Sequence, residues 1–201
     1  MLQSSFRIPV TRVITPLCRF LLRIGVSANL LSAVGGIGAT ISAIDFFTQG
    51  NYFWGTLVTL FFILFDLLDG TLARMSESGG STWGALLDST LDRVSDAAVI
   101  GSVAYYLSRS YDRLVPVLLV ALVAGSLVSY IKARAESLKI KCDGGIAERT
   151  ERLIIIFRSL FRAGLGVPYI LAIGSWFLAL ISIYTAIERL VIVFQATRVG
   201  A

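Results

Sequence analysis

Four aspartates are notable in this chain because their spacing would bring their carboxylates together. Asp66 and Asp69 are three residues apart, and Asp88 and Asp92 are four residues apart. Residues at these separations share one face of an α-helix. A Ser-Gly-Gly-Ser turn lies between the two pairs, so we expect two antiparallel neighbouring helices whose acidic faces converge. The pattern therefore predicts a cluster of four carboxylates.

A cluster of this kind suits divalent metal ions. Carboxylate oxygens are preferred ligands of Mg²⁺ and Mn²⁺, and two such ions can bridge phosphate oxygens during an in-line displacement. The sequence has no histidine, so acid–base and metal chemistry would fall to carboxylates. Two other interpretations remain open. The acids could form a structural network with Arg74 and Arg93, or they could be the ion site of a cation transporter that is not an enzyme.

The rest of the chain is more apolar than a soluble domain. Hydrophobic residues make up 56% of the 201 residues, and charged residues only 15%, whereas soluble domains are about one quarter charged. We expect one all-α polytopic membrane domain, residues 1–201, with a six-helix bundle at 28–196. The six transmembrane helices are predicted at 28–48, 52–75, 83–108, 113–138, 149–163 and 167–196.

The charge pattern predicts how the chain meets the membrane. In residues 6–24, three arginines share one side of a helical wheel, which indicates an amphipathic helix lying in the interface. The distribution of Lys and Arg favours a cell membrane protein with both termini, and the acidic cluster, on the cytoplasmic side. The net charge of +5 then indicates contact with anionic lipid headgroups and no nucleic acid. Cys18 and Cys142 are expected to be free thiols.

The acidic segments resemble the signature of the CDP-alcohol phosphotransferase family. The matching stretches are DLLDGTLAR, from Asp66 to Arg74, and GALLDSTLD, from Gly84 to Asp92. Members of that family are six-helix membrane enzymes, usually homodimers. They transfer a phosphatidyl-type group from a CDP-lipid such as CDP-diacylglycerol to an alcohol and release CMP. The resemblance implies two Mg²⁺ or Mn²⁺ ions in each site, held by Asp66, Asp69, Asp88 and Asp92.

The same resemblance implies further roles for individual residues. Asp92 would be the general base that takes the proton of the acceptor alcohol. The residues implied to contact the CDP-lipid are Asn29, Asp69, Gly70, Ala73, Arg74 and Gly84. Asn29 belongs to the segment SANLLS, and capping of the first helix is the alternative role for it. For Gly70 and Ala73 the alternative is tight packing between membrane helices.

The basic segment from Ser129 to Ile155 resembles the actinobacterial phosphatidylinositol-phosphate synthases within this family, which use inositol 1-phosphate. The resemblance implies that Lys132, Arg152 and Arg189 bind the phosphate of the acceptor. A phosphate with nearly two negative charges requires charge-assisted donors of this kind. Alternatively, Lys132 and Arg152 anchor the chain to the inner membrane face, and Arg189 extends to the headgroups. Glycerol 3-phosphate, the acceptor of phosphatidylglycerol-phosphate synthases, would suit the same three cations.

Overall fold

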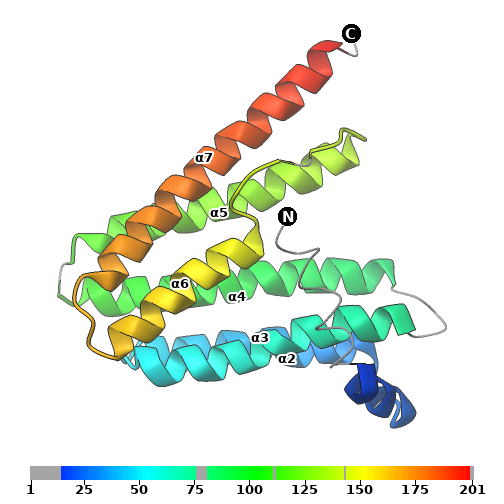
Figure 1. Cartoon of the computed structure of the whole chain (residues 1–201), viewed down its shortest axis with the longest axis horizontal. Helices are drawn as coiled ribbons and strands as arrows, with labels where there is room; N and C mark the ends of the chain where they lie inside the picture. Colours follow the sequence, from blue (N-terminus) through cyan, green and yellow to red (C-terminus); the bar gives the residue numbers. More distant parts are fainter. Residues whose placement is uncertain (1–14, 76–80, 111, 143, 200–201) are drawn as a thin grey trace. The chain divides into compact units, whose positions relative to one another are not determined.

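The structure, a computed structural model, describes residues 15–75, 81–110, 112–142 and 144–199, apart from the side chains of Asp66, Leu67 and Val199. These residues form helices and connecting loops (Figure 1). Residues 15–23 are helical, and longer helices follow them. The longer helices are α2 (Ala28–Phe47), α3 (Tyr52–Met75), α4 (Thr82–Ser108), α5 (Leu114–Ser137), α6 (Arg149–Gly164) and α7 (Ile170–Val199).

The predicted all-α fold is confirmed for the described residues, and each predicted span coincides with one of the helices α2 to α7. The largest difference is at the last helix, predicted at 167–196 and observed at Ile170–Val199. The chain turns just before this helix, with φ angles of +82° at Gly166 and +59° at Tyr169. The predicted interfacial helix at 6–24 is helical over 15–23, and its earlier part lies outside the described residues.

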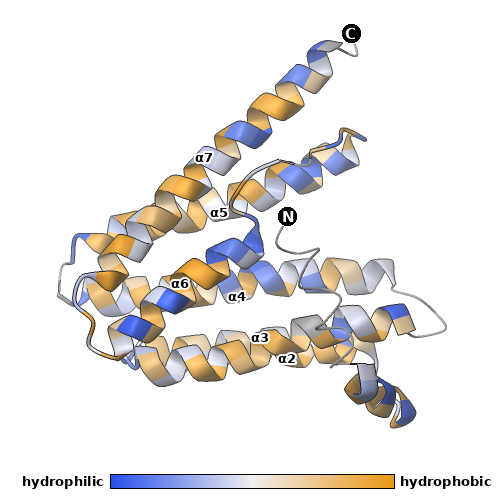
Figure 2. Cartoon of the chain, viewed as in Figure 1, coloured by the Kyte–Doolittle hydropathy of each residue, from blue (hydrophilic) through white to orange (hydrophobic). Residues whose placement is uncertain are grey.

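The described chain contains four helices that are long and apolar enough to cross a membrane: α2, α3, α5 and α7. Hydrophobic colouring dominates these helices in Figure 2, whereas hydrophilic residues occur at both ends of α6. The helix α4 includes Asp88, Asp92 and further charged residues, and α6 has only 16 residues, several of them arginines. Length and composition thus support a membrane protein with four spans, and the predicted six are not confirmed.

The chain divides into two compact units, residues 1–43 with 57–98 and residues 44–56 with 99–201. In the first unit, small residues allow α2 to pack closely on its neighbours, as is common between membrane helices. A Cβ on Gly36 of α2 would come within 2.7 Å of Leu91 Cβ on α4. The hydroxyls of Ser42 on α2 and Thr59 on α3 lie 3.0 Å apart and are buried. The helices α2, α3 and α4 are therefore held together at close range.

The helical residues 15–23 also contact α3 in the first unit. The side chain of Cys18 is fully buried, and its Sγ donates a hydrogen bond to the carbonyl of Leu68 at 3.7 Å. Burial raises the pKa of the Cys18 thiol, and the nearby Arg74 guanidinium offsets part of this rise. Cys18 and Cys142 are both free and buried, which confirms the prediction of two free thiols.

In the second unit α7 packs against α5 and α6. Gly174 of α7 lies against Ser159 of α6, where a Cβ would collide with the serine hydroxyl. The polar side chains of Ser182 and Thr185 on α7 are fully buried. The residues that α6 buries are Arg152, Ile156, Phe157, Ser159 and Leu160. Their spacing places them along one face, so α6 is an amphipathic helix with its apolar face on its neighbours.

Gly164 at the end of α6 gives a test of this packing. A Cβ on residue 164 would come within 2.8 Å of the Cα of Phe53, and a backbone atom cannot rotate away. We expect Gly164→Ala to lower the free energy of unfolding by about 1–3 kcal/mol and to lower the Tm of the detergent-solubilised protein. Gly101→Ala is the matched control, because a Cβ there would meet nothing within 4 Å. Equal Tm values for the two variants would contradict this packing.

Candidate active site

A cavity of about 530 Å³ opens in the first unit, among the helical residues 15–23, α2, α3 and α4. The first turns of both α2 and α4 form part of its wall. The cavity brings together six of the residues that the sequence predicts for a metal or CDP-lipid site: Asn29, Asp69, Gly70, Ala73, Gly84 and Asp88. The other lining residues are Leu22, Ser27, Ala28, Ser32, Leu72, Ser81, Thr82 and Ala85.

Asp69 is the most deeply placed acid of this cavity whose side chain the structure describes. Its side chain is buried, with 6% of the residue exposed. The hydroxyl of Ser32 donates a short hydrogen bond to Asp69 Oδ2 and also lies 3.1 Å from the carbonyl oxygen of Ala28. Ser32 is not among the residues predicted from the sequence. A signal was present, because Ser32 is three residues after Asn29 and so shares a helix face with it.

Asn29 lies in the cavity beside Gly84. The side-chain cap of α2 is Ser27, whose Oγ accepts a hydrogen bond from the Leu30 amide at 3.2 Å, so the capping role considered for Asn29 belongs to Ser27. A Cβ on residue 84 would collide with Asn29 Oδ1. Glycine at this position therefore lets the Asn29 amide reach the first turn of α4. The cap of α4 is Ser81, whose Oγ accepts a hydrogen bond from the Gly84 amide at 2.9 Å.

Gly70 and Ala73 give α3 a bare surface at the cavity. Among the atoms that the structure describes, a Cβ on Gly70 would meet the Nη1 atom of Arg74, at 3.9 Å. The described neighbours of this glycine do not require tight helix packing. The space leaves the backbone of α3 accessible to a ligand.

The structure places other predicted residues outside the cavity lining. Arg74 is exposed and its Nη2 lies 3.2 Å from Thr71 Oγ1 on the same helix. The side chain of Asp92 is 17% exposed, and its Oδ2 lies 3.9 Å from Arg93 Nη1. This long contact joins two residues of the alternative salt-bridge network. Asp66 is one helical turn before Asp69 on α3, and its side chain is outside the described part of the chain.

The grouping of the four acids stays a prediction. Among the side chains that the structure describes, no group of three or more His, Cys, Asp or Glu residues is arranged to hold a metal ion. Asp66, one of the four predicted ligands, is not among those side chains. The two described acids that line the cavity are Asp69 and Asp88.

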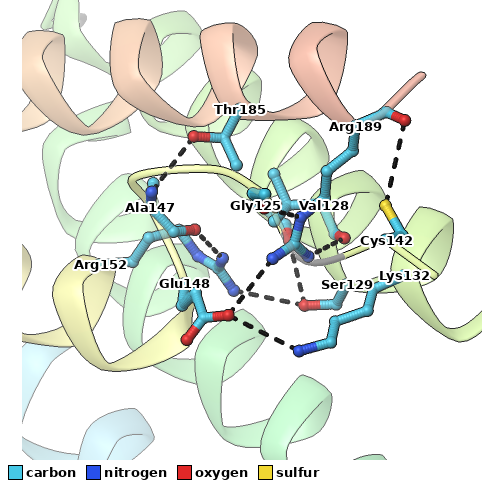
Figure 3. Close-up of polar contacts among 11 residues, drawn as sticks. Gly125, Val128, Ser129, Lys132, Cys142, Ala147, Glu148, Arg152, Thr185 and Arg189 are labelled. Atoms are coloured by element: carbon cyan, nitrogen blue, oxygen red, sulfur yellow. Dashed lines mark hydrogen bonds and ion pairs between the residues drawn. The ribbon is translucent and has the colours of Figure 1, made fainter. Parts of the chain in front are cut away.

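The predicted acceptor-phosphate residues lie in the second unit, and Figure 3 shows them close together. Arg189 of α7 is only 2% exposed. Its Nε donates to the carbonyl of Gly144 at 2.8 Å, and its Nη1 donates to the carbonyl of Val128 at 2.8 Å. A snorkelling arginine keeps its charged group in water, so this burial argues against the headgroup anchor.

Arg152 of α6 is also buried, with 7% of the residue exposed. Its Nη1 donates to the carbonyl of Ala147 at 2.9 Å, and its Nη2 lies 3.5 Å from Ser129 Oγ. Gly125 of α5 makes room for the guanidinium, because a Cβ there would be 3.1 Å from Arg152 Nε. Burial of this kind is not expected of a residue that only anchors the chain to headgroups.

Lys132 of α5 completes the set of three cations. Its Nζ lies 3.6 Å from Glu148 Oε1, and 38% of its side chain is exposed. The same carboxylate oxygen is 3.5 Å from Arg189 Nη2, so Glu148 connects two of the predicted residues (Figure 3). Glu148 is not among the residues predicted from the sequence. One acid among many basic residues is no signal by itself, because surface ion pairs are common.

Comparisons with known proteins show which curated enzymes the chain is similar to. The chain is 40% identical over 195 residues to a phosphatidylinositol phosphate synthase of Corynebacterium glutamicum, covering 95% of this chain and 88% of the relative. It is 40% identical over 194 residues to the enzyme of that name from Mycobacterium tuberculosis strain H37Rv, covering 92% of this chain and 87% of the relative.

Solved structures of the Mycobacterium tuberculosis phosphatidylinositol phosphate synthase are similar as well. A crystal structure with CDP-DAG bound has a TM-score of 0.86 at 39% identity, and covers 91% of this chain and 94% of that one. A crystal structure in complex with manganese and citrate has a TM-score of 0.83 at 38% identity, and covers 90% of this chain and 88% of that one. The family model for CDP-alcohol phosphatidyltransferases matches residues 25–193. The chain belongs to the CDP-alcohol phosphatidyltransferase family.

Proposed function

We propose that this chain is a phosphatidylinositol-phosphate synthase, which transfers the phosphatidyl group of CDP-diacylglycerol to a hydroxyl of inositol 1-phosphate and releases CMP. The observation that carries the proposal is the cavity of the first unit, which gathers Asn29, Gly70, Ala73 and Gly84 around the acids Asp69 and Asp88. The similarity to synthases that are 40% identical over most of their length supports the same reaction.

The donor atoms at this site fit divalent metal ions. Asp69 and Asp88 offer only oxygen ligands to the cavity, and hard cations such as Mg²⁺ and Mn²⁺ prefer such ligands. Asp66, Asp69, Asp88 and Asp92 would hold two ions. When bound, the ions would neutralise charge on the diphosphate of the CDP-lipid. Ser32 fixes the orientation of Asp69 through its hydrogen bond to Oδ2, so this carboxylate is positioned before any ligand binds.

Other residues of the site bind the nucleotide and accept the proton of the acceptor. Gly70, Ala73 and Gly84 leave space for the nucleotide, and Asn29 and Arg74 supply polar contacts to it. Asp92 accepts the proton of the acceptor hydroxyl as the hydroxyl oxygen bonds to the lipid-linked phosphorus, and the bond to the CMP oxygen breaks. A general base of this kind contributes about 10²- to 10⁴-fold to a rate.

Lys132, Arg152 and Arg189 bind the phosphate of the acceptor. The two arginines are buried and held by backbone carbonyls, so their guanidinium groups are fixed in place. Preorganised donors bind an anion without the cost of ordering flexible side chains. Glycerol 3-phosphate also has a phosphate monoester, and the choice between the two acceptors is a matter for experiment.

The first experiment measures CMP release by the purified protein with CDP-diacylglycerol and Mg²⁺. Inositol 1-phosphate, free inositol and glycerol 3-phosphate are supplied in parallel, and we expect turnover with inositol 1-phosphate. Asp92→Asn should lower CMP release by about 10²- to 10⁴-fold, because the base is lost. Turnover only with glycerol 3-phosphate would replace the proposed acceptor. Full activity of Asp92→Asn would contradict the role of this acid and favour a structural cluster.

A second prediction concerns the bare surface of α3. Among the described atoms, the methyl group added by Gly70→Ala meets Arg74 Nη1, at 3.9 Å. We therefore expect an unchanged Tm but a fall of roughly 10- to 100-fold in kcat/KM for CDP-diacylglycerol, because the methyl group displaces the substrate. Gly101→Ala, also a change in a helix with open space around it, should keep full activity. Loss of folding in Gly70→Ala would indicate a packing role instead.

We further propose six membrane spans, with both termini cytoplasmic, the N-terminal helix in the interface and a homodimer as the assembled form. The four apolar helices support the membrane location, and the positions of α4 and α6 match the two remaining spans. A reporter protein fused to the C-terminus should be active only in the cytoplasm, and the mass measured in detergent should be that of two chains. With six spans both termini lie on the same side of the membrane. A C-terminal reporter that is active on the opposite side from the cytoplasm would therefore contradict six spans with a cytoplasmic N-terminus.

A further inference from the structure

Glu148 lies between the cations of the predicted acceptor-phosphate site. Its Oε1 is 3.6 Å from Lys132 Nζ and 3.5 Å from Arg189 Nη2, as Figure 3 shows. Glu148 is the N-cap residue of α6, yet its side chain makes no capping hydrogen bond to that helix. The carboxylate is instead directed at the two cations, Lys132 and Arg189.

The arginines of this site do not depend on Glu148 for their positions. Arg189 donates to the carbonyls of Gly144 and Val128, both at 2.8 Å. Arg152 donates to the carbonyl of Ala147 at 2.9 Å. Both guanidinium groups are thus held by backbone acceptors. The contribution of Glu148 is therefore its negative charge.

We propose that Glu148 is an internal counter-anion that occupies the acceptor-phosphate site, and that the phosphate of the acceptor displaces it from Lys132 and Arg189. This inference rests on the proposed function of the three cations. The side chain of Glu148 is 37% exposed, whereas that of Arg189 is 3% exposed. The carboxylate thus has solvent to move into, and the guanidinium stays behind.

The exchange makes the site selective for highly charged ligands. The Glu148 carboxylate has one negative charge, and its attachment to the chain keeps it at a high local concentration near the cations. A phosphate monoester has nearly two negative charges at neutral pH and three acceptor oxygens, so it competes well. A ligand with one negative charge or none competes poorly. Glu148 is in this sense a specificity-determining residue rather than a catalytic one.

Glu148→Gln tests the proposal, because it removes the charge and keeps the size of the side chain. We expect the KM for inositol 1-phosphate to fall about 1.5- to fivefold, as is usual for one partly exposed charge pair. The kcat and the KM for CDP-diacylglycerol should stay unchanged, since only ground-state binding of the acceptor is altered. Glu136→Gln, on an exposed position of α5, changes the net charge equally and should leave all three constants unaltered.

A binding measurement separates this inference from the proposed reaction. Calorimetry with inorganic phosphate should show tighter binding to Glu148→Gln than to the unaltered protein, whether or not either releases CMP. No CMP release from the unaltered protein with any phosphorylated acceptor would reject the proposed function alone. The proposal that Glu148 is a counter-anion would be overturned if Glu148→Gln binds phosphate no more tightly than the unaltered protein. It would also be overturned if the KM for the acceptor does not fall in this variant. If Glu148→Gln does not fold, Glu148→Asp is the second variant, because its carboxylate is one methylene further from the cations. We expect it also to bind phosphate more tightly and to have a lower KM for inositol 1-phosphate than the unaltered protein.

Discussion

Burial of polar and charged groups in an apolar helical chain constrains the rest of this structure. An uncompensated charge in such surroundings costs several kcal/mol, so each buried charged group needs a partner nearby. Asp69 accepts a hydrogen bond from the hydroxyl of Ser32 on the neighbouring helix. Arg189 donates hydrogen bonds to two backbone carbonyls. These partners explain how a chain that is 56% hydrophobic retains polar and charged side chains inside its units.

Small residues meet this constraint at both sites. Gly84 lets the Asn29 amide reach the first turn of α4, and Gly125 leaves room for the Arg152 guanidinium beside α5. In each case a methyl group would crowd a polar atom. The small size of glycine therefore serves both helix packing and the two sites. Only residues without a bulky side chain allow a helix or a functional group to approach the backbone closely.

The sequence predicted the helices more completely than the site. Long apolar windows and the turn residues between them gave the positions of α2 to α7, since both signals are local. Six of the predicted site residues line one cavity because the motif residues are repeated at helical spacing. Ser32 and Glu148 were not predicted, because their roles come from contacts between segments far apart in the chain: Ser32 with Asp69, and Glu148 with Lys132 and Arg189. Composition alone also could not establish whether α4 and α6 cross the membrane.

The first turns of α2 and α4 both line the cavity that contains Asp69 and Asp88. The opening amides of a helix have no acceptor within it, and the aligned peptide dipoles place about half a positive charge at that end. The backbone thus adds a positive electrostatic potential to a cavity whose charged side chains are acidic. Because this field belongs to the helices themselves, it persists when side chains around the cavity are substituted.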